Sequence, residues 1–255
     1  MNLMGIRITF YTRCSILLQK LKLLYFFKFI LLMAILKQHR TYSILFLFSA
    51  CLIASPVCAH EVNYILENAP VENVIWFYLK LGFEHIVPLG LDHILFVICL
   101  CLLNNKFKTV FWQATAFTVA HSITLALSMQ NIIMLPAEIV EPIIALSIFF
   151  VAVENLLLDK LKPWRIILVF LFGLIHGIGF AAVLSEIGLP RDKFLTSILS
   201  FNVGVELGQI AVIAIVFALL ILPFGKKPWY RKRVVYPVSI LIALIAAYWT
   251  VERML

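Results

Sequence analysis

Two histidines and two acids stand close together just before a strongly apolar stretch. The segment EHIVPLGLDHILF, residues 84–96, contains Glu84, His85, Asp92 and His93, and the apolar run VICLCLL follows it directly. His85 and Asp92 are seven positions apart, so on a helix they lie on one face, two turns apart. Imidazole nitrogens and carboxylate oxygens are ligands of divalent transition metals, which makes this segment a candidate metal site.

Further ionisable residues occur inside other apolar segments. His121 lies in FTVAHSITLAL, and His176 lies in FGLIHGIGFAAVLSE. Two carboxylates, Glu141 and Glu206, occur in VEPIIALS and FNVGVELGQ. An ionisable side chain is costly inside a membrane span, so each of these residues becomes a candidate functional group if the segments cross a bilayer.

The composition indicates that the apolar segments do cross a membrane. Of the 255 residues, 63% are hydrophobic and only 13% are charged, which lies outside the range of soluble proteins. The formal net charge of +8 arises in the first 59 residues, which hold seven Lys or Arg and no acid. The remainder holds fourteen basic and thirteen acidic residues, so we expect no nucleic-acid partner. We therefore expect an all-α integral membrane protein.

Residues 33–59 have the pattern of a secretory signal peptide. Two basic residues precede an apolar core, and VCA at 57–59 resembles an A-x-A cleavage site. Cleavage there would make His60 the first mature residue, with an amine and an imidazole that chelate a metal together. Residues 1–32 are basic and apolar, and we expect either that translation begins after them or that residues 21–36 form an additional membrane helix.

Residues 60–84 are then a short periplasmic segment, and residues 85–255 are a domain of about six transmembrane helices, each near the ~20 residues that span a bilayer. Ten Lys or Arg in the first, third and fifth loops, against two in the second and fourth, place the odd loops in the cytoplasm. The mature amino terminus is then outside. We therefore expect a protein of the bacterial inner membrane whose mature amino terminus lies in the periplasm. The predicted spans are residues 86–104, 109–129, 136–158, 164–186, 194–223 and 234–251.

This topology places the polar residues at one depth, in the outer half or the middle of the bilayer. Imidazole and carboxylate ligands suit nickel, cobalt, zinc or iron(II), copper(II) is not excluded, and the lack of a thiolate or methionine cluster argues against copper(I). Two alternatives remain open: the histidines form hydrogen bonds between helices, or the acids and histidines relay protons. The candidate metal ligands are His60, His85, Asp92, His93, His121, His176, Glu206 and Glu141.

One further membrane carboxylate is expected to be structural. Glu154 lies at the inner end of its predicted span, near the basic third loop. A carboxylate at such a position most often forms an interfacial ion pair, and we expect its partner to be Lys160 or Lys162.

Five segments, in order over residues 82–209, resemble the HupE/UreJ family of membrane proteins. The resemblance matches the family's first-span motif to His85, Asp92 and His93, and its His-Gly motif to His176. It implies a polytopic membrane protein associated with nickel-dependent hydrogenase and urease systems, acting as a nickel or cobalt permease. The five segments are GFEHIVPLGLDHILF, FTVAHSITLALS, VEPIIALS, FGLIHGIGFAAVL and FNVGVELGQ.

Together, the residues and the resemblance predict transport or binding of a divalent transition metal, with nickel first. We expect His60 and His85 to capture the ion from outside and the buried ligands to hold it. The expected partners are the lipid bilayer, the metal ion and a metalloenzyme maturation system. The competing hypotheses are a membrane metalloenzyme, in which a bound metal activates water, and an accessory subunit that does not transport.

Overall fold

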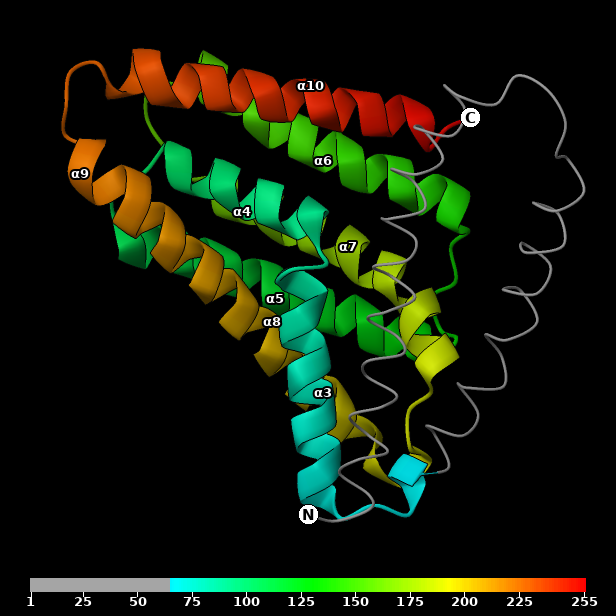
Figure 1. Cartoon of the computed structure of the whole chain (residues 1–255). Helices are drawn as coiled ribbons and strands as arrows, with labels where there is room; N and C mark the ends of the chain where they lie inside the picture. The colour runs from blue at the N-terminus through cyan, green and yellow to red at the C-terminus, as the bar shows by residue number, and fades with distance from the viewer. Residues whose placement is uncertain (1–64) are drawn as a thin grey trace, which may run out of the picture. The chain divides into compact units, whose positions relative to one another are not determined.

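The computed structural model describes residues 65–255, and this part of the chain contains helices and no strand. The predicted all-α membrane fold is therefore confirmed for the described residues, whereas the predicted signal peptide and His60 lie outside them. Leu66–Ser185 and Leu189–Leu255 belong to one structural unit. Its main helices (Figure 1) are α3 (Val71–Ile86), α4 (Leu91–Leu102), α5 (Phe107–Met129), α6 (Ala137–Leu157), α7 (Arg165–Ile187), α8 (Phe194–Val216), α9 (Leu222–Phe224) and α10 (Tyr236–Glu252).

Within residues 65–255, five helical stretches are long and apolar enough to cross a membrane. Three of them, α5, α6 and α7, agree with the predicted spans to within two residues at each end. The fourth stretch, Arg191–Phe224, contains α8 and α9, and the fifth, Arg231–Glu252, contains α10. Large apolar side chains such as Leu195 and Leu244 are exposed along these helices, as expected of a surface that faces lipid. The chain is therefore a multi-pass membrane protein.

A sixth crossing requires two helices, because α3 and α4 meet at a bend of 67°. α4 has only 12 residues, about 18 Å at ~1.5 Å per residue, and the hydrocarbon core is roughly 30 Å thick. Pro88 has no backbone N–H to donate, and Gly90 precedes the first residue of α4, so the helix is interrupted between them. The structure thus differs from the continuous span predicted at 86–104, and it forms a helix within the segment 60–84.

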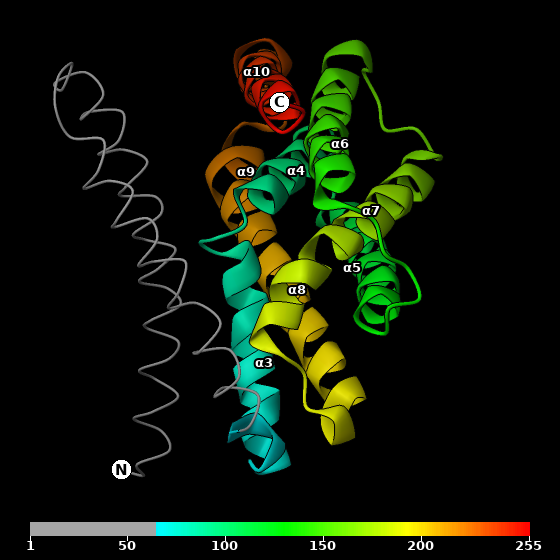
Figure 2. The same ribbon diagram turned by 90° about the vertical axis from the view of Figure 1, so that its right-hand side faces the viewer.

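Glycines allow α3 and α8 to lie side by side (Figures 1 and 2). A Cβ on Gly204 would overlap the carbonyl oxygen of Leu79, and a Cβ on Gly82 would overlap that of Phe201. Small residues of this kind let membrane helices pack backbone to backbone. α8 also contacts α4 and α5, while α6 packs against α4 and α10. The end of α3, which carries His85, is therefore held against the bundle.

A charged cluster joins the end of α6 to the beginning of α7. The side chain of Arg165 is fully buried, and its Nε lies 3.3 Å from Oε2 of Glu154. Its two Nη groups donate to Oδ1 of Asn155, and Nη2 also donates to the backbone carbonyl of Cys99 in α4. The predicted pairing of Glu154 with Lys160 or Lys162 is therefore wrong, because its partner is Arg165. We call Glu154, Asn155, Arg165 and Cys99 the arginine cluster.

Candidate metal centre

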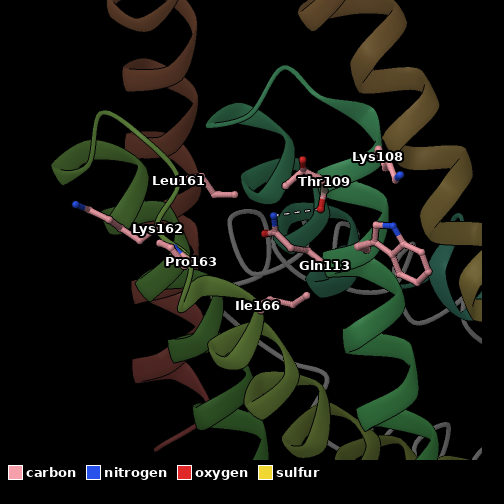
Figure 3. A pocket seen from close by; sticks show the side chains of 8 residues that line it. Lys108, Thr109, Gln113, Leu161, Lys162, Pro163 and Ile166 are labelled. Atoms are coloured by element: carbon pink, nitrogen blue, oxygen red, sulfur yellow. Dashed lines mark hydrogen bonds between the residues drawn. The ribbon is translucent and has the colours of Figure 1, made fainter.

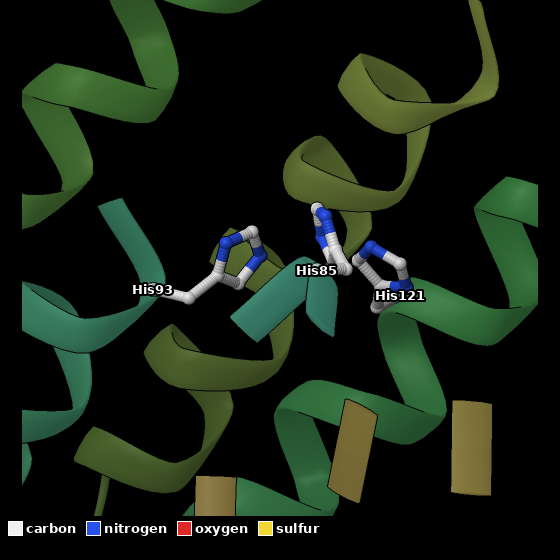
Figure 4. Close-up of side chains that lie close together, drawn as sticks. All are labelled: His85, His93 and His121. Carbon is white, nitrogen blue, oxygen red and sulfur yellow. The ribbon is translucent and has the colours of Figure 1, made fainter. Parts of the chain in front are cut away.

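Three histidines from three helices form a group that we call the histidine cluster. His85 lies in the last turn of α3, His93 in the first turn of α4, and His121 in the middle of α5. One ring nitrogen from each of them lies within 4.8 Å of the other two. Figure 4 shows the ring of His85 between those of His93 and His121. Such a spacing allows three imidazoles to bind one metal ion after small side-chain movements.

The bend between α3 and α4 brings the first two histidines together. His85 and His93 are eight positions apart, and the interruption between them turns the second helix back toward the end of the first. Their ring centroids are 4.6 Å apart. The third ring comes from α5, with centroids 6.0 Å from His85 and 6.1 Å from His93. The break that shortens α4 is therefore also the feature that assembles the cluster.

The hydrogen bonds of His121 leave one of its ring nitrogens free to bind a ligand. Asn202 of α8 donates its Nδ2 to the carbonyl of Ile198 at 2.8 Å, which orients the side-chain amide. Its Oδ1 then faces Nδ1 of His121 at 3.2 Å, and it accepts a hydrogen bond from the N–H at that position. In the neutral ring the lone pair is therefore on Nε2, which is buried and has no hydrogen-bond partner within residues 65–255.

A chain of hydrogen bonds sets the protonation of His93 in the same way. The hydroxyl of Ser147 donates to the carbonyl of Ile144 at 2.7 Å, so its oxygen accepts from Nε2 of His176 at 3.0 Å. Nδ1 of His176 is then an acceptor, and it faces Nε2 of His93 at 3.4 Å. With both rings neutral, Nε2 of His93 carries the proton and its Nδ1 keeps the lone pair. His176 therefore orients His93 through this hydrogen bond, as partners of metal-binding histidines commonly do.

Aromatic side chains enclose the histidine cluster. The ring centroid of Phe180 lies 3.9 Å from that of His85, and Phe201 lies 5.7 Å from it. Phe117 lies 5.7 Å from His93. His121 is 0% exposed and His93 is 6% exposed. Nε2 of His85 is also buried without a hydrogen-bond partner in the described part of the chain. Because buried nitrogens of this kind are normally paired, the unpaired lone pairs point to a ligand that the cluster accommodates.

The predicted acidic ligands lie in other surroundings. Asp92 forms an ion pair with Arg253, with 2.9 Å between Oδ2 and Nη2. Arg253 also donates to the backbone carbonyl of Glu141 at 3.2 Å, while the side chain of Glu141 is exposed. Glu206 accepts a hydrogen bond of 2.6 Å from the hydroxyl of Thr115. The structure thus brings together His85, His93 and His121, with His176 behind them, and the complete ligand set stays a prediction.

Three residues of this arrangement were not predicted from the sequence to belong to the site. Asn202 shares a helix face with Glu206, which is a visible signal, but the sequence does not reveal that it faces His121. Ser147 is the last residue of the segment VEPIIALS. Arg253 is separated by 161 positions from its partner Asp92, and no local pattern connects them.

The fold and the cluster define a multi-pass helical membrane protein with a buried group of imidazoles compatible with metal binding. The family model described as HupE / UreJ protein matches residues 60–253, which is more than half of the chain. The chain belongs to this family, as its five segments predicted, and the family is associated with metal handling. No curated protein and no solved structure matches the chain.

Proposed function

We propose that this protein carries a divalent transition metal ion, nickel first, through the membrane, with the ion held by His85, His93 and His121. The observation that carries the proposal is that three imidazoles from three helices bring one ring nitrogen each within 4.8 Å of the other two, close enough to share one ion. In addition, Nε2 of His85 and Nε2 of His121 are buried and have no hydrogen-bond partner in the described residues.

The donor chemistry supports a transition metal rather than calcium or magnesium. Calcium and magnesium prefer oxygen ligands, whereas imidazole suits nickel, cobalt, zinc and copper(II). The two described cysteines, Cys99 and Cys101, are buried near the arginine cluster and contribute no thiolate to the group of three histidines. Nickel is favoured over cobalt by the family association alone, and zinc, iron(II) and copper(II) are the further metals to offer.

The charge of the cluster supports an exchangeable ion. Three neutral imidazoles do not reduce the +2 charge of the metal, so the apolar surroundings penalise the bound state. A structural metal is commonly held by thiolates or carboxylates that offset this charge. A site whose three ligands are neutral imidazoles therefore differs from a structural metal site.

The charge of the loops predicts the orientation of the chain in the membrane, and we propose inward transport on this orientation. The excess of Lys and Arg in the odd-numbered loops puts these loops in the cytoplasm and the beginning of α3 outside. On this orientation the ion enters from the periplasm and leaves toward the cytoplasm. His60, which lies outside the described residues, is our proposed first capture group if signal cleavage occurs before it.

The test is metal uptake into sealed proteoliposomes that contain the full chain. Nickel, cobalt, zinc, iron(II) and copper(II) are offered in turn, and the internal metal is measured over time. We expect saturable uptake of nickel or cobalt and a loss of that uptake in His93→Ala. Phe96→Leu is the matched control, because Phe96 is a buried aromatic residue of the same helix and carries no ligand atom.

One outcome would contradict transport, and another would contradict the assigned site. Tight retention of a stoichiometric metal without uptake favours the metalloenzyme or the accessory subunit, and water-dependent chemistry at the metal separates these two. Equal uptake by the wild type and His93→Ala removes the histidine cluster from the path.

A further inference from the structure

A pocket of about 360 Å³ lies between the beginning of α5 and the connection from α6 to α7. It is separate from the histidine cluster, and the two have no lining residue in common. Figure 3 shows side chains from both segments around it. The lining residues are Lys108, Thr109, Trp112, Gln113, Leu161, Lys162, Pro163 and Ile166.

Gln113 presents an unused hydrogen-bond acceptor to this pocket. Its side chain is only 2% exposed. Its Nε2 donates to the carbonyl of Thr109 at 3.3 Å, which orients the amide and leaves Oε1 toward the pocket. Oε1 is buried and has no hydrogen-bond partner within the part of the chain that the structure describes. Figure 3 shows the amide directed from α5 toward Leu161, Lys162 and Pro163. A ligand that supplies a hydroxyl donor would satisfy it.

The charge at the pocket is positive. Lys108 and Lys162 are both exposed, and the lining residues include no acid. Lys108 lies in the first turn of α5, and no side chain within the described residues caps that turn. The amino-terminal end of a helix carries a partial positive charge that attracts anions. The pocket therefore offers two ammonium groups and a helix amino terminus to an anion such as a phosphate.

Apart from Thr109, the remaining lining is apolar, and it continues onto the surface that faces lipid. Trp112 is 53% exposed and Ile166 is 42% exposed. Tryptophan at such a position is typical of the interface between headgroups and acyl chains. Leu161 and Pro163 add apolar surface on the opposite side. A small soluble anion would leave these walls without a partner, whereas a lipid brings an anionic headgroup and acyl chains in one molecule.

We propose that the pocket binds an anionic phospholipid whose headgroup carries a hydroxyl, such as phosphatidylglycerol. Its phosphate lies near Lys108, Lys162 and the beginning of α5. Its headgroup hydroxyl donates to Oε1 of Gln113, and its acyl chains lie along Trp112 and Ile166. Basic pockets between membrane helices on the cytoplasmic side are known to hold lipid headgroups of this kind.

The test is native mass spectrometry of the purified full chain with defined lipids. The lipids are phosphatidylglycerol, phosphatidylmethanol, phosphatidylethanolamine and phosphatidylcholine, and inorganic phosphate is the soluble competitor. We expect the tightest binding for phosphatidylglycerol. A lysine at a lipid surface contributes roughly fivefold in affinity, so Lys108→Gln with Lys162→Gln weakens phosphatidylglycerol binding about 30-fold. The control pair, Lys226→Gln with Lys227→Gln, removes the same charge outside the pocket and leaves the affinity within about twofold.

The hydroxyl contact has its own variant. Gln113→Leu removes the acceptor, and we expect it to abolish the preference for phosphatidylglycerol over phosphatidylmethanol, which is anionic but has no headgroup hydroxyl. Gln130→Leu, at the other end of α5, is the control and keeps the preference. Unchanged thermal unfolding of each variant establishes that it is folded.

Three results would overturn the proposal. Equal binding of phosphatidylglycerol and phosphatidylcholine by the wild type excludes an anionic site. An equal loss in the two lysine pairs shows a general effect of surface charge. Displacement of the lipid by inorganic phosphate at equal concentration assigns the pocket to a free anion.

Discussion

The histidine cluster and the arginine cluster are both buried and polar, but only the arginine cluster pairs opposite charges within itself. In the arginine cluster a positive and a negative side chain lie together, and the guanidinium also donates to Asn155 and to the carbonyl of Cys99. In the histidine cluster, Nε2 of His85 and Nε2 of His121 have no partner among the described residues. The carboxylate oxygens of Glu154 and Nε of Arg165 also lack a hydrogen bond among these residues, but there the two opposite charges compensate each other. The two imidazole nitrogens have no such compensation, so the need for a partner is left to a ligand.

This comparison gives the two clusters different roles. The arginine cluster ties α4, α6 and α7 together and has no unpaired charge to offer an ion. In the histidine cluster, Asn202 orients the ring of His121, and His176, which is itself bound by Ser147, contacts Nε2 of His93. These contacts orient two of the rings and leave Nε2 of His121 without a partner among the described residues. We expect variants of the two clusters to separate stability from metal binding.

The largest effect is expected at the arginine cluster. Arg165→Met leaves Glu154 buried without a counter-charge, so the free energy of unfolding should fall by about 3–5 kcal/mol. Reversible unfolding in mixed detergent micelles measures this loss. Adding Glu154→Leu should restore most of the stability, because the double variant has no unpaired charge. An equally unstable double variant would show that the ion pair itself is not the reason.

The next effect separates binding from stability. His85→Leu removes one of three proposed ligands, and we expect the dissociation constant for nickel to rise roughly 100-fold or more, above the usual cost of losing an outer partner. The free energy of unfolding should stay equal or increase, because a buried nitrogen without a partner has been removed. Calorimetric titration and unfolding measure the two quantities. A loss of stability like that of Arg165→Met would erase the contrast between the clusters.

A smaller effect is expected where a residue only orients a ligand. Asn202→Ala frees the ring of His121, and the dissociation constant should rise about 10–100-fold. Gln209→Ala is the matched control, because Gln209 lies on the same face of α8 but accepts from Thr118 rather than from a histidine. Binding in the control should be close to that of the wild type. Equal losses in both variants would mean that Asn202 acts through the packing of α8.

The smallest effect is expected at Asp92. Its carboxylate pairs with Arg253 and both side chains are partly exposed, so the pair is worth about 1 kcal/mol or less. We expect Asp92→Asn to change the affinity for nickel by no more than about fivefold, and Arg253→Gln to do the same. Titration of both variants and of the double variant measures their coupling. A loss at Asp92→Asn as large as that of His85→Leu would restore Asp92 as a ligand.

Much of the fold could be predicted because span length is a local property. The apolar run predicted at 136–158 is α6, Ala137–Leu157, since the bilayer demands a long helix whatever its neighbours are. The bend between α3 and α4 is different. Pro88 and Gly90 are visible in the sequence, but whether they start a helix or break one depends on the packing of α3 against α8.

The sequence predicted the depth of the candidate site in the membrane, but it did not predict which side chains face one another there. The positions of His93 and His121 within their spans indicated a common level in the membrane. Helix rotation decides which side chains meet at that level, and rotation follows from contacts between distant segments. For that reason Asp92, the direct neighbour of His93, forms an ion pair with Arg253 instead, and Glu206 accepts a hydrogen bond from Thr115.

X-ray absorption at the nickel K-edge of the purified, nickel-loaded protein tests directly whether the histidine cluster binds the metal. We expect one ion per chain, with the scattering pattern of about three imidazole nitrogens at roughly 2.0–2.1 Å. The same pattern should be absent from His85→Leu, once unfolding measurements have shown that this variant is folded. A shell of oxygen ligands alone, or an identical imidazole pattern in His85→Leu, would contradict the assignment of the histidine cluster as the metal site.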